Sequence, residues 1–150
     1  MRLEDYVSFE LAKKLKKLGF NEPCMHSYTK YTSDFVYDSD PDHSESHKKG
    51  EVRIYDFWNR NNENGKHTYS MPHLYEVQRW FRERGLSVEP FLDMDMYSED
   101  IVNCRETWRY KIKDFKRNIE VSSPVFNRFE DALTEGLVNA CRFYASRSHI

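Results

Sequence analysis

Two acidic stretches carry carboxylates at the short spacing that hard cations prefer. Asp38, Asp40 and Asp42 match the first, third and fifth positions of a calcium-binding loop, whose side-chain oxygens surround the ion. The sixth position is His43 instead of glycine, and the twelfth is Lys49 instead of a bidentate glutamate. The match fails at two positions that shape such a loop, so a solvated loop is the favoured interpretation.

The second acidic stretch fails in the same way. It begins with Asp93 and Asp95, but Ser98 stands at the sixth position and Cys104 at the twelfth. The residues that could join in a transition-metal site are Cys24, His26, His43 and His47. Their spacing matches no known zinc motif. We therefore expect no metal and no other cofactor.

Signatures of nucleophilic catalysis are also missing. There is no Gly-x-Ser-x-Gly turn, and the five glycines form neither a phosphate loop nor a dinucleotide fingerprint. The three cysteines are widely spaced and include no Cys-x-x-Cys pair, so a disulfide framework or zinc knuckle is not expected. The sequence names no catalytic residue.

A row of positive side chains runs along residues 104–115, the segment that alternates most clearly between apolar and polar residues, and continues just beyond it. Such a row could hold the phosphates of a nucleic acid while neighbouring rings stack on its bases. It could equally be the solvent face of a half-covered sheet, where lysines discourage edge pairing. The candidate nucleic-acid or anion-binding residues are Arg105, Arg109, Lys111, Lys113, Lys116 and Arg117.

Aromatic residues make up 15% of the chain, which is enough to leave some rings outside the core. Exposed rings often mark protein contacts. The candidate contact residues are Tyr55, Phe57, Trp58 and Trp80. A core crowded with rings is the alternative interpretation.

Three segments repeat apolar residues at helical spacing. The first covers residues 8–18, with Ser8 as a candidate N-cap. The second covers residues 73–84, where His73 and Glu76 have capping-box spacing. A glycine follows each of these two segments, at the position where many helices end.

The third helix has the most regular apolar stripe. It starts with the capping spacing of Asn127 and Glu130 and runs to Tyr144. Gly136 lies on this stripe, although glycine costs about 1 kcal/mol relative to alanine in a helix. We therefore expect this helix to approach a sheet closely at Gly136.

The remaining apolar segments are typical of strands. The expected strands are residues 24–32, 51–58, 86–92 and 104–115. Pro90 favours an edge position, and the polar residues 33–50 are expected to form a long mobile loop. Hairpins followed by helices favour an α+β fold in the order α-ββ-α-ββ-α. We expect an antiparallel or mixed sheet of about four strands, with three helices mainly on one face.

Length and composition indicate one globular domain over residues 1–150. Apolar residues make up 39% and charged residues 32%, and the net charge of −2 does not favour nucleic-acid binding. The first residues are acidic and lack the apolar stretch of a secretory signal. No apolar run approaches the ~20 residues that cross a bilayer. We therefore expect a cytoplasmic protein without membrane contact.

Three segments carry a resemblance to a known family. They are residues 8–24 (SFELAKKLKKLGFNEPC), 72–81 (PHLYEVQRWF) and 129–137 (FEDALTEGL). In this order they resemble a family of small uncharacterised proteins found in gut Bacteroidales and their phages and conjugative elements. The family usually has threonine where His73 stands and a hydroxyl where Asn127 stands, so the differences concern helix caps. The resemblance implies a bacterial or phage cytoplasm and an accessory role in a mobile element.

These observations support one leading hypothesis and two alternatives. The leading hypothesis is a non-enzymatic accessory or interaction protein that binds itself, as a homo-oligomer, or another protein. The first alternative is a nucleic-acid-binding module that uses the basic row. The second and least favoured alternative is an enzyme with a metal ion in the acidic loop.

Overall fold

The computed structural model describes residues 1–36, 46–93 and 107–147. The elements in chain order are η1 (Leu3–Asp5), α1 (Phe9–Leu18), β1 (Cys24–Lys30), β2 (Val52–Asn59), β3 (Thr68–Ser70), α2 (Leu74–Glu83), β4 (Leu86–Leu92), β5 (Trp108–Asp114), β6 (Ile119–Ser122) and α3 (Phe129–Arg147). The three expected helices and the α+β class are confirmed.

The strands form two antiparallel sheets of three strands each, in the orders β2-β1-β3 and β4-β5-β6. The prediction of a single sheet of about four strands is therefore wrong. The two strands missed by the sequence analysis are β3, with three residues, and β6, with four. Segments this short contain too few residues for a period to be recognised.

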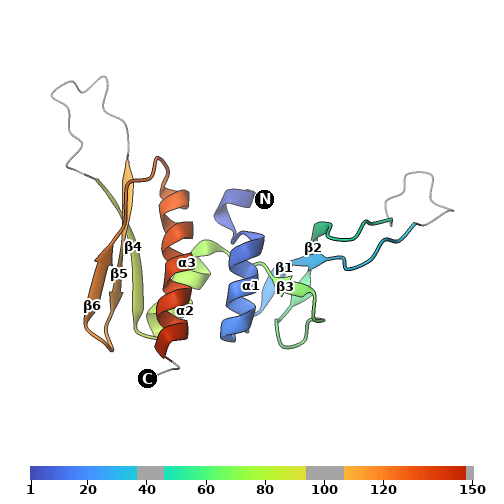
Figure 1. The fold of residues 1–150 in the computed structure, drawn as a ribbon, viewed down its shortest axis with the longest axis horizontal. Coiled ribbons are helices and arrows are strands. Elements are labelled where there is room, and N and C mark those ends of the chain that lie inside the picture. The colour runs from blue at the N-terminus through green and yellow to red at the C-terminus, as the bar shows by residue number, and fades with distance from the viewer. Residues whose placement is uncertain (37–45, 94–106, 148–150) are drawn as a thin grey trace, which may run out of the picture.

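The helices form a layer between the two sheets (Figure 1). The helices α2 and α3 pack on the sheet β4-β5-β6, while α1 packs between α3 and the sheet β2-β1-β3. Pro90 lies on the edge strand β4, as predicted. Each sheet thus has helices on one face.

Local signals set the ends of α1. The Ser8 hydroxyl accepts a hydrogen bond from the Leu11 N–H at 3.2 Å, which confirms the predicted N-cap. At the other end Gly19 has a φ of 93°, a left-handed conformation that glycine adopts without strain. Both ends of this helix could therefore be predicted from single residues.

The position of the predicted cap is confirmed for α2, which begins after His73, and is wrong by one residue for α3. The His73 side chain makes no capping hydrogen bond, and its ring stacks on Tyr6 with the ring centres 4.1 Å apart. In α3 the Ala132 N–H donates to the carbonyl of Arg128 at 3.1 Å, so the helix starts one residue later than the Asn127 cap implies. In α2 the stacking of His73 on Tyr6 takes the place of a capping bond, and in α3 the helix begins one residue further along the chain.

The expected close approach at Gly136 is confirmed. A Cβ atom at this position would lie 2.8 Å from Val88 Cγ1 and 3.1 Å from Tyr110 Cγ, which are side-chain atoms of β4 and β5. Distances this short leave no room for a methyl group. Glycine therefore lets α3 lie directly on the sheet.

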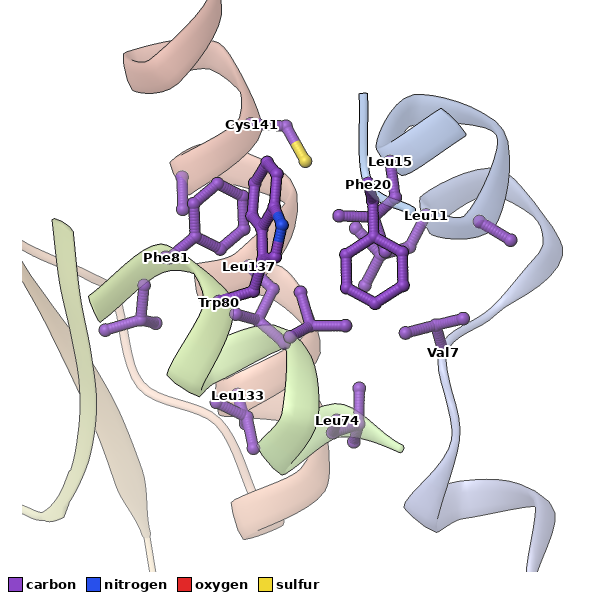
Figure 2. Packing of buried hydrophobic residues seen from close by; sticks show 14 of the residues in the cluster. Val7, Leu11, Leu15, Phe20, Leu74, Trp80, Phe81, Leu133, Leu137 and Cys141 are labelled. Carbon is purple, nitrogen blue, oxygen red and sulfur yellow. The ribbon is translucent and has the colours of Figure 1, made fainter. Parts of the chain in front are cut away.

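The core lies where the three helices meet. Figure 2 shows Leu11, Leu15 and Phe20 facing Trp80 and Leu137 across this junction. Trp80 is only 3% exposed, so the prediction that its ring contacts another protein is wrong. Its ring centre lies 5.6 Å from that of Phe20 and 5.4 Å from that of Tyr144. Trp80 of α2 therefore packs between α3 and Phe20, which follows α1, instead of facing a partner.

The prediction that residues 33–50 form a long mobile loop is partly wrong. Phe35 and His47 pair in antiparallel fashion, and each N–H donates to the other's carbonyl at 2.8 Å. The described ends of this segment therefore form an arm that continues the β1–β2 hairpin (Figure 1). Residues 37–45, which include the candidate calcium ligands Asp38, Asp40 and Asp42, lie outside the described residues.

Candidate functional site

Among the described residues, the two sheets end in four edge strands that differ in how open they are. The strands β3 and β6 have three and four residues, and short edges discourage pairing with other chains. The edge of β4 contains Pro90, and the Gln78 side chain of α2 donates to the carbonyl of Val88 at 2.6 Å. By contrast, β2 has eight residues and pairs only with β1. It is the longest open edge.

Four large apolar side chains are exposed along β2. We call them the β2 strip: Val52, Ile54, Phe57 and Trp58. Trp58 is 58% exposed and Phe57 is 44% exposed, so both rings are available to a partner, as expected. Tyr55, the remaining candidate on this strand, is half-buried, and its hydroxyl is hydrogen-bonded to that of Tyr31. Large exposed apolar groups on an open edge are typical of interaction surfaces.

The position of α1 explains why Val52 and Ile54 remain uncovered. The Phe9 ring of α1 packs against Tyr28 of β1 and Tyr69 of β3, with ring centres 5.6 and 5.5 Å apart. In the sheet, β2 lies on the far side of β1 from β3. Ile54, opposite Tyr28 in register, is therefore beyond the cover of the helix. Alternation in the sequence cannot distinguish this uncovered half of the face from the covered half.

A β-bulge accounts for the exposure of the two rings. Asp56 pairs with His26 and Asn59 pairs with Cys24, so Phe57 and Trp58 together oppose one residue of β1. Bulges disturb the alternation of side chains and re-aim them. The bulge therefore places two aromatic rings at the end of the open edge.

The basic row is divided by the structure. Arg109, Lys111 and Lys113 lie on the face of β5 that points away from α3. Arg109 forms an ion pair with Asp93 at 3.1 Å, and Lys111 forms one with Glu120 at 3.2 Å. Two of the three charges are thus compensated by carboxylates of the same sheet. Nucleic-acid binding by this row stays a prediction, and its first member, Arg105, lies outside the described residues.

Arg117 is directed to the other side of the sheet. Its guanidinium donates to the carboxylate of the fully buried Asp114 at 2.7 Å, and Arg147 donates to the same carboxylate at 2.6 Å. Burial alone would raise the pKa of Asp114, but the hydrogen bonds from Arg147 and Arg117 outweigh it and hold the pKa well below its usual range. Arg117 therefore stabilises the fold, and Lys116 remains beside it in the turn after β5.

Histidines that the sequence separates meet in a small hollow of about 270 Å³. His26 Nδ1 lies 2.6 Å from Asp56 Oδ1, and His73 stacks on Tyr6 nearby. A histidine–carboxylate pair can act as a general base when a nucleophile adjoins it. The thiol that lines this hollow belongs to Cys24, and burial raises its pKa to about 12. The hollow thus lacks an activated thiol.

One cluster of carboxylates was not anticipated from the sequence. Oxygens of Glu4, Asp5 and Glu130 lie within 4.8 Å of one another, because η1 approaches the start of α3. The Arg128 guanidinium pairs with Glu4 and lies 3.6 Å from Glu130. The cluster therefore already has a counter-charge from the protein.

Comparisons with protein-family models, with curated proteins and with solved structures find no match to this chain. Among the described residues, no helix combines the length and the apolar character that crossing a bilayer requires.

Proposed function

We propose that this chain is a non-enzymatic interaction protein that docks a partner strand on the β2 strip. The observation that carries the proposal is an open edge of eight residues with Phe57 and Trp58 exposed at its end. An open edge offers backbone groups to an added strand, and aromatic side chains often supply much of the binding energy of an interface.

A second copy of the chain is the proposed occupant. Antiparallel pairing of β2 with β2 is isologous, so the same surface serves both copies and the assembly closes at a dimer. With the two-fold axis at Tyr55, Val52 of each copy lies opposite Trp58 of the other. The dimer then brings Val52 and Trp58 of the two copies into contact and joins two three-stranded sheets into one.

The resemblance to proteins of gut Bacteroidales and their mobile elements supports the wider setting of this proposal. We infer an accessory role in the cytoplasm of a bacterium or phage-infected cell, where a small dimer acts through contacts and not through catalysis.

Light scattering coupled to size-exclusion chromatography tests the proposal. We expect a dimer at high protein concentration and a monomer for the variant Trp58→Lys, because the lysine replaces the ring opposite Val52 of the other copy and puts a charge into an apolar contact. Phe115→Lys is the matched control, since the Phe115 side chain is 59% exposed and that of Trp58 is 58% exposed. This control should remain dimeric.

Two results would contradict the proposal. One is a monomeric wild-type protein over the whole concentration range. The other is an equal loss of the dimer in both variants, which would place the interface elsewhere or indicate a general effect of charge.

A further inference from the structure

A second surface, separate from the β2 strip, concentrates positive charge. A hollow of about 570 Å³ lies between α1 and the loop before β3. Its lining consists of Glu10, Lys13, Lys14, Lys16, Lys17, Lys66 and Tyr69. This lining, which we call the lysine hollow, carries five positive charges and one negative charge, in a chain whose net charge is −2.

Lys16 fixes the two walls of the lysine hollow to each other. Its Nζ atom donates to the carbonyls of Gly65 and Thr68 at 2.7 Å each, and it lies 5.1 Å from the centre of the Tyr69 ring. These contacts tie the last turn of α1 to the loop before β3. One positive charge is therefore held in place at the junction of the walls.

Buried asparagines hold the wall that carries Lys66. Asn61 donates from Nδ2 to the carbonyl of Phe20 at 2.8 Å and accepts from the Ser70 N–H at 2.9 Å. The Ser70 hydroxyl in turn donates to Asn59 Oδ1 at 2.6 Å. This network joins the loop to the end of α1 and to β3. Lys66 is thus presented opposite the lysines of α1 by a fixed segment.

The charges of the opposite wall repel one another. Lys17 of α1 is four residues after Lys13 and three residues after Lys14, and like charges at these spacings destabilise a helix. Glu10 pairs with Lys13 at 3.1 Å. Within the described parts of the chain, no carboxylate forms an ion pair with Lys14, Lys17 or Lys66. An anion in the hollow would relieve this repulsion.

We propose that the lysine hollow binds phosphate groups. Several ammonium groups, each a compact charge with three N–H donors, suit an anion that offers several oxygens from different directions. Both a small oligophosphate ligand and the backbone of a nucleic acid present this chemistry. The site differs from the basic row because its charges face one hollow and are mostly uncompensated.

Calorimetric titration at about 10 mM salt, where charges act over about 30 Å, tests the proposal. The probes are sodium tripolyphosphate and a single-stranded DNA of about 12 nucleotides, a length that a small binding groove can contact. The test variant is Lys14→Gln/Lys17→Gln/Lys66→Gln, which leaves the anchoring Lys16 in place. The matched control is Arg109→Gln/Lys111→Gln/Lys113→Gln, which removes the same charge from the basic row.

We expect the test variant to bind at least about tenfold more weakly, because losing several phosphate contacts lowers ionic affinity steeply. The control should bind as the wild type does, and the test variant should melt at a higher temperature than the wild type at low salt. Binding of both probes indicates a polymer as ligand, and binding of tripolyphosphate alone indicates a small phosphate compound. Absence of binding to the wild type, or equal losses in the two variants, would overturn the proposal.

Discussion

A single buried carboxylate holds three parts of the fold together. Asp114 accepts hydrogen bonds from Arg117 and Arg147, and Arg147 also donates to the carbonyl of Gly85 at 3.2 Å. The end of α3, the turn after β5 and the turn after α2 thus meet at one charge. Sequence alternation assigns Arg117 to the solvent side, because it cannot reveal that the turn brings the guanidinium back to Asp114.

Replacing this carboxylate should be costly. We predict that Asp114→Asn lowers the free energy of unfolding by about 3–5 kcal/mol, since it leaves two partly buried guanidinium groups without their counter-charge. Urea denaturation at neutral pH measures the change. The control Glu120→Gln removes a half-exposed partner of Lys111 and should cost about 1 kcal/mol or less.

The same residue should make stability depend on pH. Because the pKa of Asp114 is lower in the folded than in the unfolded chain, its contribution is complete above the unfolded value of about 3.9. The contribution is lost as the pH falls further toward the folded value. The wild type should therefore lose more stability than Asp114→Asn on acidification. An identical pH dependence of the two proteins would refute the assigned role.

At the scale of elements, the contact between α3 and its sheet depends on the absence of a side chain at Gly136. We predict that Gly136→Ala lowers the free energy of unfolding by about 1–3 kcal/mol through overpacking, despite the better helix propensity of alanine. The added Cβ would lie 2.8 Å from Val88 Cγ1. Thermal unfolding monitored by circular dichroism measures the loss.

Two further variants separate overpacking from a general effect of alanine. Gly65→Ala introduces a Cβ with no atom within 4 Å and should change stability by less than about 1 kcal/mol. Val88→Ala removes the Cγ1 methyl group that the added Cβ would meet at 2.8 Å. Gly136→Ala should therefore lower the free energy of unfolding by less in the Val88→Ala background than in the wild type. Additive effects of the two substitutions would argue against a direct clash.

At the scale of the whole molecule, one core connects both sheets through the helix layer. The continuous cluster includes Tyr28 of β1, Leu137 of α3 and Ile112 of β5. Cooperative unfolding is expected when elements share their buried contacts. The two sheets should therefore not melt independently.

Leu137→Ala tests this coupling. The fully buried side chain lies at the junction of the helices, so we predict a loss of about 2–5 kcal/mol in the free energy of unfolding. The transitions followed by circular dichroism and by tryptophan fluorescence should shift together. Val125→Ala, at a position 37% exposed, should shift neither by a comparable amount. Separate transitions for the two signals would show that the sheets belong to independent units.

The sequence by itself determined what depends on neighbours along the chain. The three helices, the cap at Ser8, the glycine after α1 and the close approach at Gly136 follow from residue types at helical spacing. These features need no knowledge of distant segments, because a helix forms its hydrogen bonds within itself.

Only the tertiary structure decided which strands pair and which side chains stay exposed. Strand pairing joins distant residues, so six strands could be divided into two sheets only once their partners were known. Burial depends on what lies above a side chain, so Trp80 is covered by Phe20 and by Tyr144 of α3 while Trp58 remains open on β2. The lysine hollow likewise exists because Lys66 is brought to α1 from far along the chain.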